Sequence, residues 1–152
     1  MTRVLCIIGL AVALLMSGCA RIRPPRKTEP VTRTMLTTGY CRCGKCCGWK
    51  RTWYGMPVYK SGPLKGKRKQ VGVTASGTRA QHGTIAADTR RYPFGTVMYI
   101  DGYGYGRVED RGGGIKGEHI DLFFTSHKAA LEWGRKWVQV KIWPPPAEPG
   151  RP

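Results

Sequence analysis

The sequence predicts an all-β fold, a small closed β-barrel with one short helix before its last strand. Short β-rich runs separated by glycines, a glycine- and proline-rich composition and a single capped helical segment support this prediction. Gly (21) and Pro (11) are frequent in the 152 residues, which suits a turn-rich β fold better than a helical bundle. The length allows one domain of ordinary size.

The chain begins with the features of an export signal. Arg3 precedes an apolar run over residues 4–16, which is short for a transmembrane helix and typical of a signal peptide. The run ends in Ser17-Gly18-Cys19, which resembles the bacterial lipobox with its lipidated cysteine. We therefore expect a signal peptide over residues 1–18 and a lipid on Cys19 that binds a membrane. The alternatives are an ordinary secretory signal and an uncleaved anchor.

Two segments lack the composition of a folded core. Residues 19–33 are rich in Arg and Pro, and both proline and like charge keep a chain extended. Residues 144–152 form a Pro-rich tail that we expect to be disordered. The folded unit is therefore expected over residues 34–143.

Within that unit the element patterns follow one another closely. Candidate strands, mostly bounded by glycines, cover residues 35–40, 70–74, 84–87, 96–101, 106–110 and 119–124. Ser126 is a candidate N-cap for a helix over residues 127–133, which Gly134 ends. In the last strand Val138, Val140 and Ile142 alternate with polar residues, the period of a half-buried strand.

Four cysteines lie within seven residues, at Cys41, Cys43, Cys46 and Cys47. Structural zinc sites usually take their ligands from two separated segments, and exported proteins meet an oxidising compartment. We therefore favour disulfides that join Cys46 and Cys47 to Cys41 and Cys43, because adjacent cysteines pair poorly. A structural zinc ion at this cluster and free thiols are the alternatives. A nucleophilic cysteine is the least favoured role, because no histidine is adjacent to the cluster in sequence, although the fold can bring one there.

Carboxylates are scarce, with nine Asp and Glu in the whole chain. Asp110 and Asp121 flank a glycine-rich loop, residues 111–117, that can fold tightly. If Ile120 and Leu122 face the core, Asp121 faces a groove. Two carboxyl groups brought together there leave one with a raised pKa, as a general acid for glycosidic cleavage needs. Turn caps or partners for Lys and Arg are the alternative roles.

Four blocks of sequence resemble the three-aspartate (3D) domain of bacterial cell-wall proteins. They are Thr38-Gly-Tyr-Cys with Lys45-Cys-Cys-Gly, Thr74-Ala-Ser-Gly-Thr78, Gly83-Thr-Ile-Ala-Ala-Asp88 with Pro93-Phe-Gly-Thr96, and Asp110-Arg-Gly-Gly-Gly-Ile-Lys-Gly-Glu-His-Ile-Asp-Leu122. The last block also resembles the catalytic barrel of membrane-bound lytic transglycosylases of the A type. The resemblance covers about residues 36–142 and implies a six-stranded double-psi β-barrel.

The resemblance implies cleavage of the β-1,4 bond between N-acetylmuramic acid and N-acetylglucosamine in peptidoglycan, without a cofactor. The product carries a 1,6-anhydro-muramic end. The three family aspartates fall on Asp88, Asp110 and Asp121, the candidate catalytic residues. Asp121 is expected as acid and base, Asp110 as its orienting neighbour, and Asp88 as the organiser of the loop to Pro93. Candidate substrate-binding residues are Thr78, Lys116 and His119.

The formal charge of +17 allows other functions. A non-catalytic peptidoglycan-binding lipoprotein is the main alternative, because related double-psi barrels such as the expansins bind or loosen polysaccharide without cutting it. A nucleic-acid partner is suggested by charge alone and disfavoured by the lipobox. Residues 20–70 hold 14 Lys and Arg against Glu29 alone, which fits a basic tether facing an anionic envelope. The expected location is the periplasmic face of the outer membrane.

Overall fold

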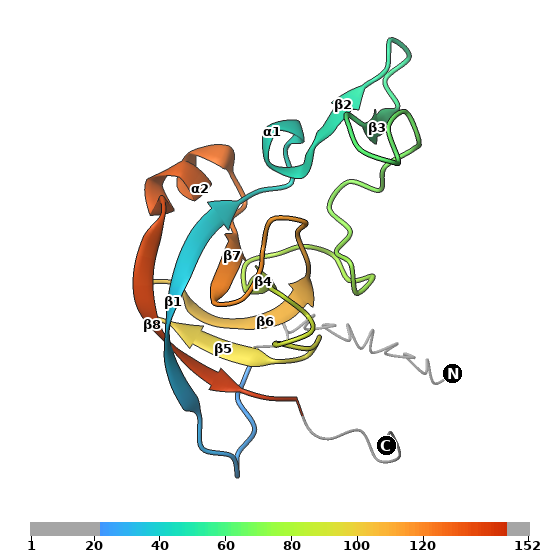
Figure 1. Ribbon diagram of the computed structural model, residues 1–152. Helices are drawn as coiled ribbons and strands as arrows, with labels where there is room; N and C mark the ends of the chain where they lie inside the picture. Colours follow the sequence, from blue (N-terminus) through green and yellow to red (C-terminus); the bar gives the residue numbers. More distant parts are fainter. Residues whose placement is uncertain (1–21, 146–152) are drawn as a thin grey trace, which may run out of the picture.

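Six strands close into a barrel in the computed structural model, which describes residues 22–145 (Figure 1). In chain order they are β1 (Val31–Tyr40), β4 (Thr84–Ala86), β5 (Val97–Ile100), β6 (Gly104–Asp110), β7 (His119–Phe123) and β8 (Lys136–Trp143). Around the barrel the order is β1-β7-β4-β6-β5-β8, so most neighbours in space are not neighbours in sequence.

The pairing has a two-fold pattern. β1 runs parallel to β7 and β4 parallel to β6, whereas the other four neighbouring pairs are antiparallel. Exchanging β1 with β6, β4 with β7 and β5 with β8 reproduces the same order and the same directions. The first three strands and the last three are therefore equivalent halves that interlock. This confirms the expected six-stranded double-psi β-barrel.

Alternating side chains from all six strands fill the barrel. The fully buried ones include Met35, Ile85, Met98, Ile120 and Val140, one from each of five strands. Removal of this apolar surface from water stabilises the barrel.

Helix α2 (His127–Trp133) covers one end of the barrel and packs on β1. The two backbones meet at Gly39, where an added Cβ would lie 2.6 Å from the carbonyl oxygen of Ala130. A side chain at this position would push the helix away, so glycine is required there.

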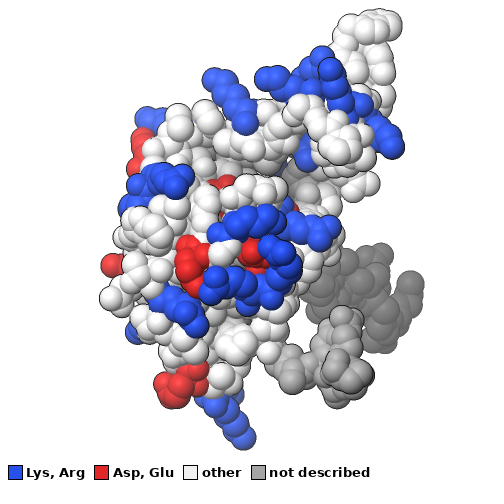
Figure 2. Space-filling view, viewed as in Figure 1, with Lys and Arg blue, Asp and Glu red and all other residues white. Residues whose placement is uncertain are grey.

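A small basic extension connects β1 to β4. It contains α1 (Gly44–Cys47) and the two-stranded sheet of β2 (Trp49–Arg51) and β3 (Pro57–Tyr59). We call residues 42–69 the hairpin lobe; its two-stranded sheet projects from the barrel in Figure 1. The lobe has nine Lys and Arg and no Asp or Glu. Basic side chains accordingly gather over this part of the molecule (Figure 2).

Most of the elements predicted from sequence are present. The helix begins and ends as predicted, with the Ser126 hydroxyl accepting a hydrogen bond from the Ala129 N–H at 3.1 Å. The prediction of a strand over residues 70–74 is wrong. Gly72 has a positive φ of 79°, and the Thr74 hydroxyl oxygen accepts a hydrogen bond from the Thr78 N–H, which closes a turn. The elements of the hairpin lobe were not predicted, because three- and four-residue elements carry little periodicity.

The barrel begins three residues before the expected boundary at residue 34. Val31, Thr32 and Arg33 pair with β8 and so belong to β1 rather than to a linker. The predicted signal peptide, Cys19 and residues 146–152 of the tail lie outside the described residues. Between residues 22 and 145, no helix is long and apolar enough to cross a membrane.

Candidate active site

The barrel register places Asp110 and Asp121 on either side of one residue of β4. Asp110 ends β6 and pairs with Ala86 in the parallel ladder. Asp121, at the centre of β7, pairs with the same Ala86 in the antiparallel ladder. Ile120 and Leu122 are buried in the core, so strand alternation turns Asp121 to the other face. The prediction that Asp121 faces a groove is therefore confirmed.

A pocket of about 280 Å³ opens on this face and is lined by both carboxyl groups. Its volume is close to the lower limit of about 300 Å³ for small-molecule sites. The barrel contributes Tyr40 and Phe123 to the wall, and the hairpin lobe contributes Trp49. The pocket therefore lies between the barrel and the lobe and takes residues from both.

Asp121 has the environment of a carboxylic acid whose pKa lies well above its ordinary value. Burial, as the largest effect, raises its pKa from 3.8 to about 6, and the negative charge of Asp110 adds to the rise. A hydrogen bond from Thr38 opposes it by stabilising the charged form. The expectation of one carboxyl group with a raised pKa in this pair is met by Asp121.

A short hydrogen-bonded chain leads from Asp121 through Thr38 to His119. Thr38 and Asp121 are partners in the β1·β7 ladder, and the Thr38 hydroxyl donates to Asp121 Oδ1 at 2.9 Å. The same hydroxyl oxygen lies 3.0 Å from His119 Nε2. Because the hydroxyl proton is used toward Asp121, this oxygen accepts from the imidazole N–H. Burial, with help from Arg135, lowers the pKa of His119 and favours the neutral ring.

The sequence motifs predict no role for Thr38, although this residue starts the first of the four motif blocks. His119 is among the substrate-binding residues predicted from sequence. The structure instead places His119 behind Thr38, where it supports the hydroxyl that orients Asp121. The parallel register of β1 with β7 brings the three residues together, and sequence spacing does not reveal that register.

Asp110 is held at the pocket by three hydrogen bonds to its carboxylate. The Tyr40 hydroxyl donates to Oδ2 at 3.1 Å, and the N–H groups of Ala75 and Arg111 donate to Oδ1 at 3.0 and 2.9 Å. Burial raises the pKa of Tyr40, so this phenol remains a donor. Among the described residues the Arg111 guanidinium forms no ion pair, so Asp110 can act on Asp121 as a negative charge.

Asp88 lies outside this pocket. Its carboxylate is 6% exposed and accepts hydrogen bonds from the Arg90 side chain and from the N–H groups of Arg90 and Gly117. These hydrogen bonds lower its pKa to about 2. The one from the Arg90 side chain has the largest effect, and those from the two backbone N–H groups have smaller effects. Asp88 thus joins the loop after β4 to the loop before β7. This position supports the loop-organising role expected for it and gives it no contact with the pocket.

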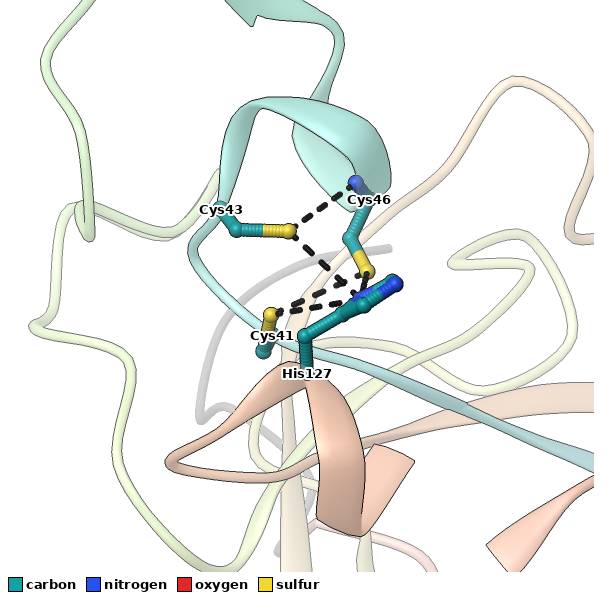
Figure 3. A group of neighbouring side chains, drawn as sticks. All are labelled: Cys41, Cys43, Cys46 and His127. Carbon is teal, nitrogen blue, oxygen red and sulfur yellow. Dashed lines mark hydrogen bonds between the residues drawn. The ribbon is translucent and has the colours of Figure 1, made fainter. Parts of the chain in front are cut away.

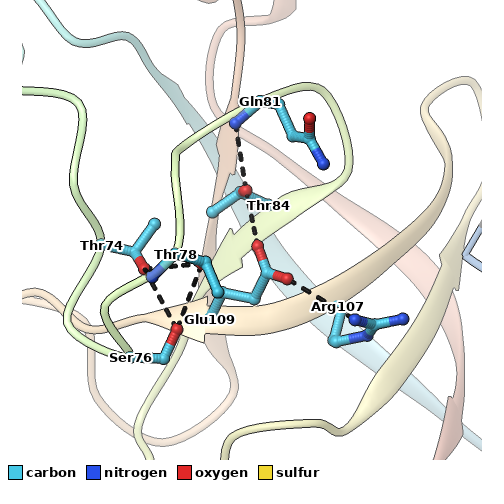
Figure 4. A network of polar contacts seen from close by, with 7 residues as sticks. All are labelled: Thr74, Ser76, Thr78, Gln81, Thr84, Arg107 and Glu109. Carbon is cyan, nitrogen blue, oxygen red and sulfur yellow. Dashed lines mark hydrogen bonds and ion pairs between the residues drawn. The ribbon is translucent and has the colours of Figure 1, made fainter. Parts of the chain in front are cut away.

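Thr78 and Lys116 also lie away from Asp121. The Thr78 hydroxyl contacts those of Thr74 and Ser76 in a network that packs beside Glu109 (Figure 4). Lys116 borders the separate hollow that contains Asp88. Neither residue lines the pocket of Asp121.

The cysteine cluster adjoins the pocket and contains no disulfide. All four thiols in this segment are free, so the expected disulfides are absent from the structure. Cys41, Cys43 and Cys46 converge on His127 instead (Figure 3). Cys47 points elsewhere, donates to the Cys41 carbonyl oxygen and lines the pocket. Burial raises the pKa of Cys47 to about 11, which leaves a neutral thiol unsuited to nucleophilic attack.

Residues 83–143 match the family model of the 3D domain. The resemblance inferred from the aspartate blocks is thereby confirmed for the part of the barrel from β4 to β8. The match includes Asp88, Asp110 and Asp121, and it excludes β1 and the hairpin lobe.

Three curated relatives align with part of the chain. Over 75 residues, 47% of the chain, it is 39% identical to YabE of Bacillus subtilis, which is named for cell wall shaping, and 41% identical to the cell wall-binding protein YocH of the same organism. It is 32% identical over 95 residues, 59% of the chain, to RlpA of Aquifex aeolicus, named as a probable endolytic peptidoglycan transglycosylase. The aligned segments span 18%, 26% and 37% of these three proteins.

Solved structures of MltA, a lytic transglycosylase of Escherichia coli, align with part of this chain. One crystal structure is 21% identical, with a TM-score of 0.41, and covers 51% of this chain and 28% of MltA. The complex of MltA with chitohexaose has a TM-score of 0.40 at 21% identity and covers 48% and 28% of the two chains. These partial overlaps carry no weight for the chemistry.

Proposed function

We propose that this protein is a peptidoglycan lytic transglycosylase with Asp121 as its acid and base. The observation that carries the proposal is the placement of Asp121, half-buried in a pocket beside Asp110, with a pKa of about 6. A carboxyl group in this state is half protonated near pH 6 and about one-tenth protonated at pH 7, which leaves an acid form that can protonate a glycosidic oxygen. The cell-wall names of YabE, YocH and RlpA give the substrate class.

The reaction needs one carboxyl group in two successive roles. Protonated Asp121 donates its proton to the oxygen that links N-acetylmuramic acid to N-acetylglucosamine, and the C1–O bond breaks. The resulting carboxylate then takes the proton from the C6 hydroxyl of the muramic acid while O6 bonds to C1. The products are a 1,6-anhydro-muramic end and a free N-acetylglucosamine hydroxyl, and Asp121 is protonated again. No water molecule and no second nucleophile is consumed.

Two neighbours prepare Asp121 for these roles. The charge of Asp110 favours the protonated acid before cleavage. The Thr38 hydroxyl holds Oδ1 at 2.9 Å and stabilises the carboxylate after cleavage. Opposing influences of this kind keep the pKa close to the working pH, which favours a group that must both give and take a proton.

The pocket wall matches the chemistry of the muramic acid unit. Arg42, Lys69 and Arg111 line the pocket and can pair with the lactyl carboxylate or the acidic stem peptide that this sugar carries. Trp49 is partly exposed in the same wall and offers a flat apolar face to a sugar ring. A neutral glycan such as chitin would contact the face of Trp49 but has no negative charge to pair with the basic side chains.

A second candidate function is peptidoglycan binding without cleavage. The name of YocH, a cell wall-binding protein that is 41% identical over 75 residues, favours it. The two functions share a substrate and differ only in whether Asp121 transfers a proton. A product assay therefore separates them.

The decisive experiment digests purified sacculi with the wild type and with Asp121→Asn, followed by mass spectrometry of the soluble fragments. The wild type is expected to release anhydro-muropeptides, and the substitution should reduce the rate by about 100- to 10,000-fold. Sacculus binding should be retained, because Asn keeps the shape of the side chain. Asp101→Asn, in the exposed turn between β5 and β6, is the matched control. Binding without anhydro products in the wild type would establish the second candidate instead.

We further propose that the protein is lipid-anchored in the cell envelope through Cys19, at the periplasmic face of an outer membrane. The lipobox-like end of the apolar segment and the cell-wall relatives support this location. Cells that express the chain should incorporate labelled palmitate into it. Cys19→Ala should abolish the label and Cys6→Ala, within the expected signal peptide, should not. Label that persists in Cys19→Ala would contradict the anchor.

A further inference from the structure

We propose that Cys41, Cys43, Cys46 and His127 bind one structural Zn²⁺ ion. Their four ligand atoms lie within 4.8 Å of one another. Figure 3 shows the three sulfur atoms and the imidazole directed toward a common centre between the start of α1 and the start of α2. The ligands come from two segments that are about 80 residues apart in sequence, the arrangement that structural zinc sites favour.

The spacing of the atoms fits a tetrahedral ion. Zinc bonds of about 2.3 Å to sulfur and about 2.1 Å to nitrogen give edges of about 3.8 Å between sulfurs and about 3.6 Å between sulfur and nitrogen. The sulfurs of Cys41 and Cys46 are 3.8 Å apart. His127 Nδ1 lies 3.3 Å from the sulfur of Cys46, 3.6 Å from that of Cys43 and 4.0 Å from that of Cys41.

A disulfide explains the same cluster less well. Bonded sulfurs are about 2.05 Å apart, whereas those of Cys41 and Cys46 are separated by 3.8 Å. Any one disulfide would also leave the third thiol and His127 without a partner. A metal ion uses all four groups.

The surroundings support an ion bound by three thiolates. The Cys46 N–H lies 3.5 Å from the Cys43 sulfur, a contact that stabilises a thiolate. One Zn²⁺ with three thiolates and a neutral imidazole carries a charge of about −1. Lys45, Lys50 and Lys60 border the surface hollow that includes Cys43 and His127. Their positive charge offsets that of the site.

Cys47 does not belong to the ligand set. Its thiol donates to the Cys41 carbonyl oxygen at 3.1 Å, and its side chain lines the pocket of Asp121. The site is therefore of the Cys₃His type, and four protein ligands leave no open position for substrate. Such closed sites stabilise structure and do not catalyse.

The hairpin lobe has few other means of staying folded. Val58 is the one apolar side chain buried within residues 42–69, whereas Trp53, Tyr54 and Leu64 are exposed. Segments with so small a core usually need a metal or disulfides. Because Cys46 and Trp49 line the pocket, an ion that fixes α1 also fixes one wall of the candidate active site.

The test uses the full chain, exported by its own leader segment and purified from the cell envelope. Elemental analysis should find one zinc per chain. Alkylation and peptide mapping should find no disulfide within residues 41–47. Removal of zinc with a chelator should lower the thermal midpoint of the protein. Replacement by Co²⁺ should give the visible bands of a tetrahedral ion and the charge-transfer absorption of three thiolates.

Substitutions identify the ligands. Cys43→Ser and His127→Ala should each lose zinc under dialysis that leaves the wild type loaded, and Cys47→Ser, the matched control, should retain it. A disulfide between any two of Cys41, Cys43 and Cys46 would overturn the proposal, as would four-thiolate cobalt absorption or zinc loss confined to Cys47→Ser. If the ligand variants fail to fold, chelation and the cobalt spectrum of the wild type still decide the outcome.

Discussion

Asp121 and Asp88 are both shielded carboxyl groups of the same barrel, and their surroundings move their pKa values in opposite directions. Asp88 is only 6% exposed to solvent, yet hydrogen bonds from Arg90 lower its pKa to about 2. Asp121 is only half-buried, and its pKa rises to about 6. Burial alone therefore does not decide the protonation state.

The number and kind of neighbours decide it. Asp88 has the Arg90 guanidinium and two backbone N–H groups as donors, which stabilise a carboxylate. Asp121 has the Thr38 hydroxyl and the Leu122 N–H as donors, no cationic partner, and faces the negative charge of Asp110. A carboxylate with many donors joins loops together, whereas one with few donors is available for proton transfer. The comparison thus separates a structural aspartate from a reactive one.

The largest predicted effect is on the unfolding free energy, and it tests whether the folded state destabilises the Asp121 carboxylate. Asp121 has a folded-state pKa of about 6 against 3.8 in the unfolded chain, so the folded state binds its proton more tightly. Unfolding free energy is therefore lost as pH rises from about 4 through 6. Asp121→Asn removes this loss and should raise the unfolding free energy at pH 7 by about 3 kcal/mol. The difference from the wild type should shrink to near zero below pH 4.

Chemical denaturation of both proteins between pH 3 and 8 measures this difference. Asp88→Asn is the opposite control, because a lowered pKa contributes stability that is present above pH 4 and is lost as pH falls toward 2. That variant should be less stable than the wild type at pH 7. Equal stability of Asp121→Asn and the wild type at pH 7 would show that the folded state does not destabilise the Asp121 carboxylate. That result would contradict the raised pKa.

The barrel half of the site could be predicted from sequence because strand patterns act locally. The alternation around Asp121 placed Ile120 and Leu122 in the core, and the glycine-rich loop indicated that Asp110 lies near. The relation of Thr38 to Asp121 could not be predicted in this way. It depends on which strands are neighbours in an interlocked barrel, and alternation within one strand carries no information about the next.

The cysteine cluster is a second site whose arrangement depends on contacts between strands and could not be predicted from local sequence. His127 reaches the cysteines because β7 ends beside β1 and α2 begins there, a contact between residues about 80 positions apart. Local cysteine spacing suggested disulfides and included Cys47, which the structure turns toward the pocket. The strand predicted over residues 70–74 is a turn because Gly72 has a positive φ, which an extended strand does not allow. Composition alone does not reveal that angle.

A smaller change tests whether Thr38 sets the pKa of Asp121. Thr38→Val removes the hydroxyl that donates to Oδ1 at 2.9 Å and keeps the branched shape of the side chain. Because that hydrogen bond lowers the pKa of Asp121, its loss should raise the pKa above 6 by up to about one unit. The fall in anhydro-muropeptide release at alkaline pH should shift upward by the same amount, and so should the ¹³C NMR titration of the Asp121 carboxyl carbon. Thr34→Val, at an exposed position of β1, should leave both curves in place. An unshifted NMR titration in Thr38→Val would mean that burial, Asp110 and the Leu122 N–H set the pKa of Asp121 without Thr38.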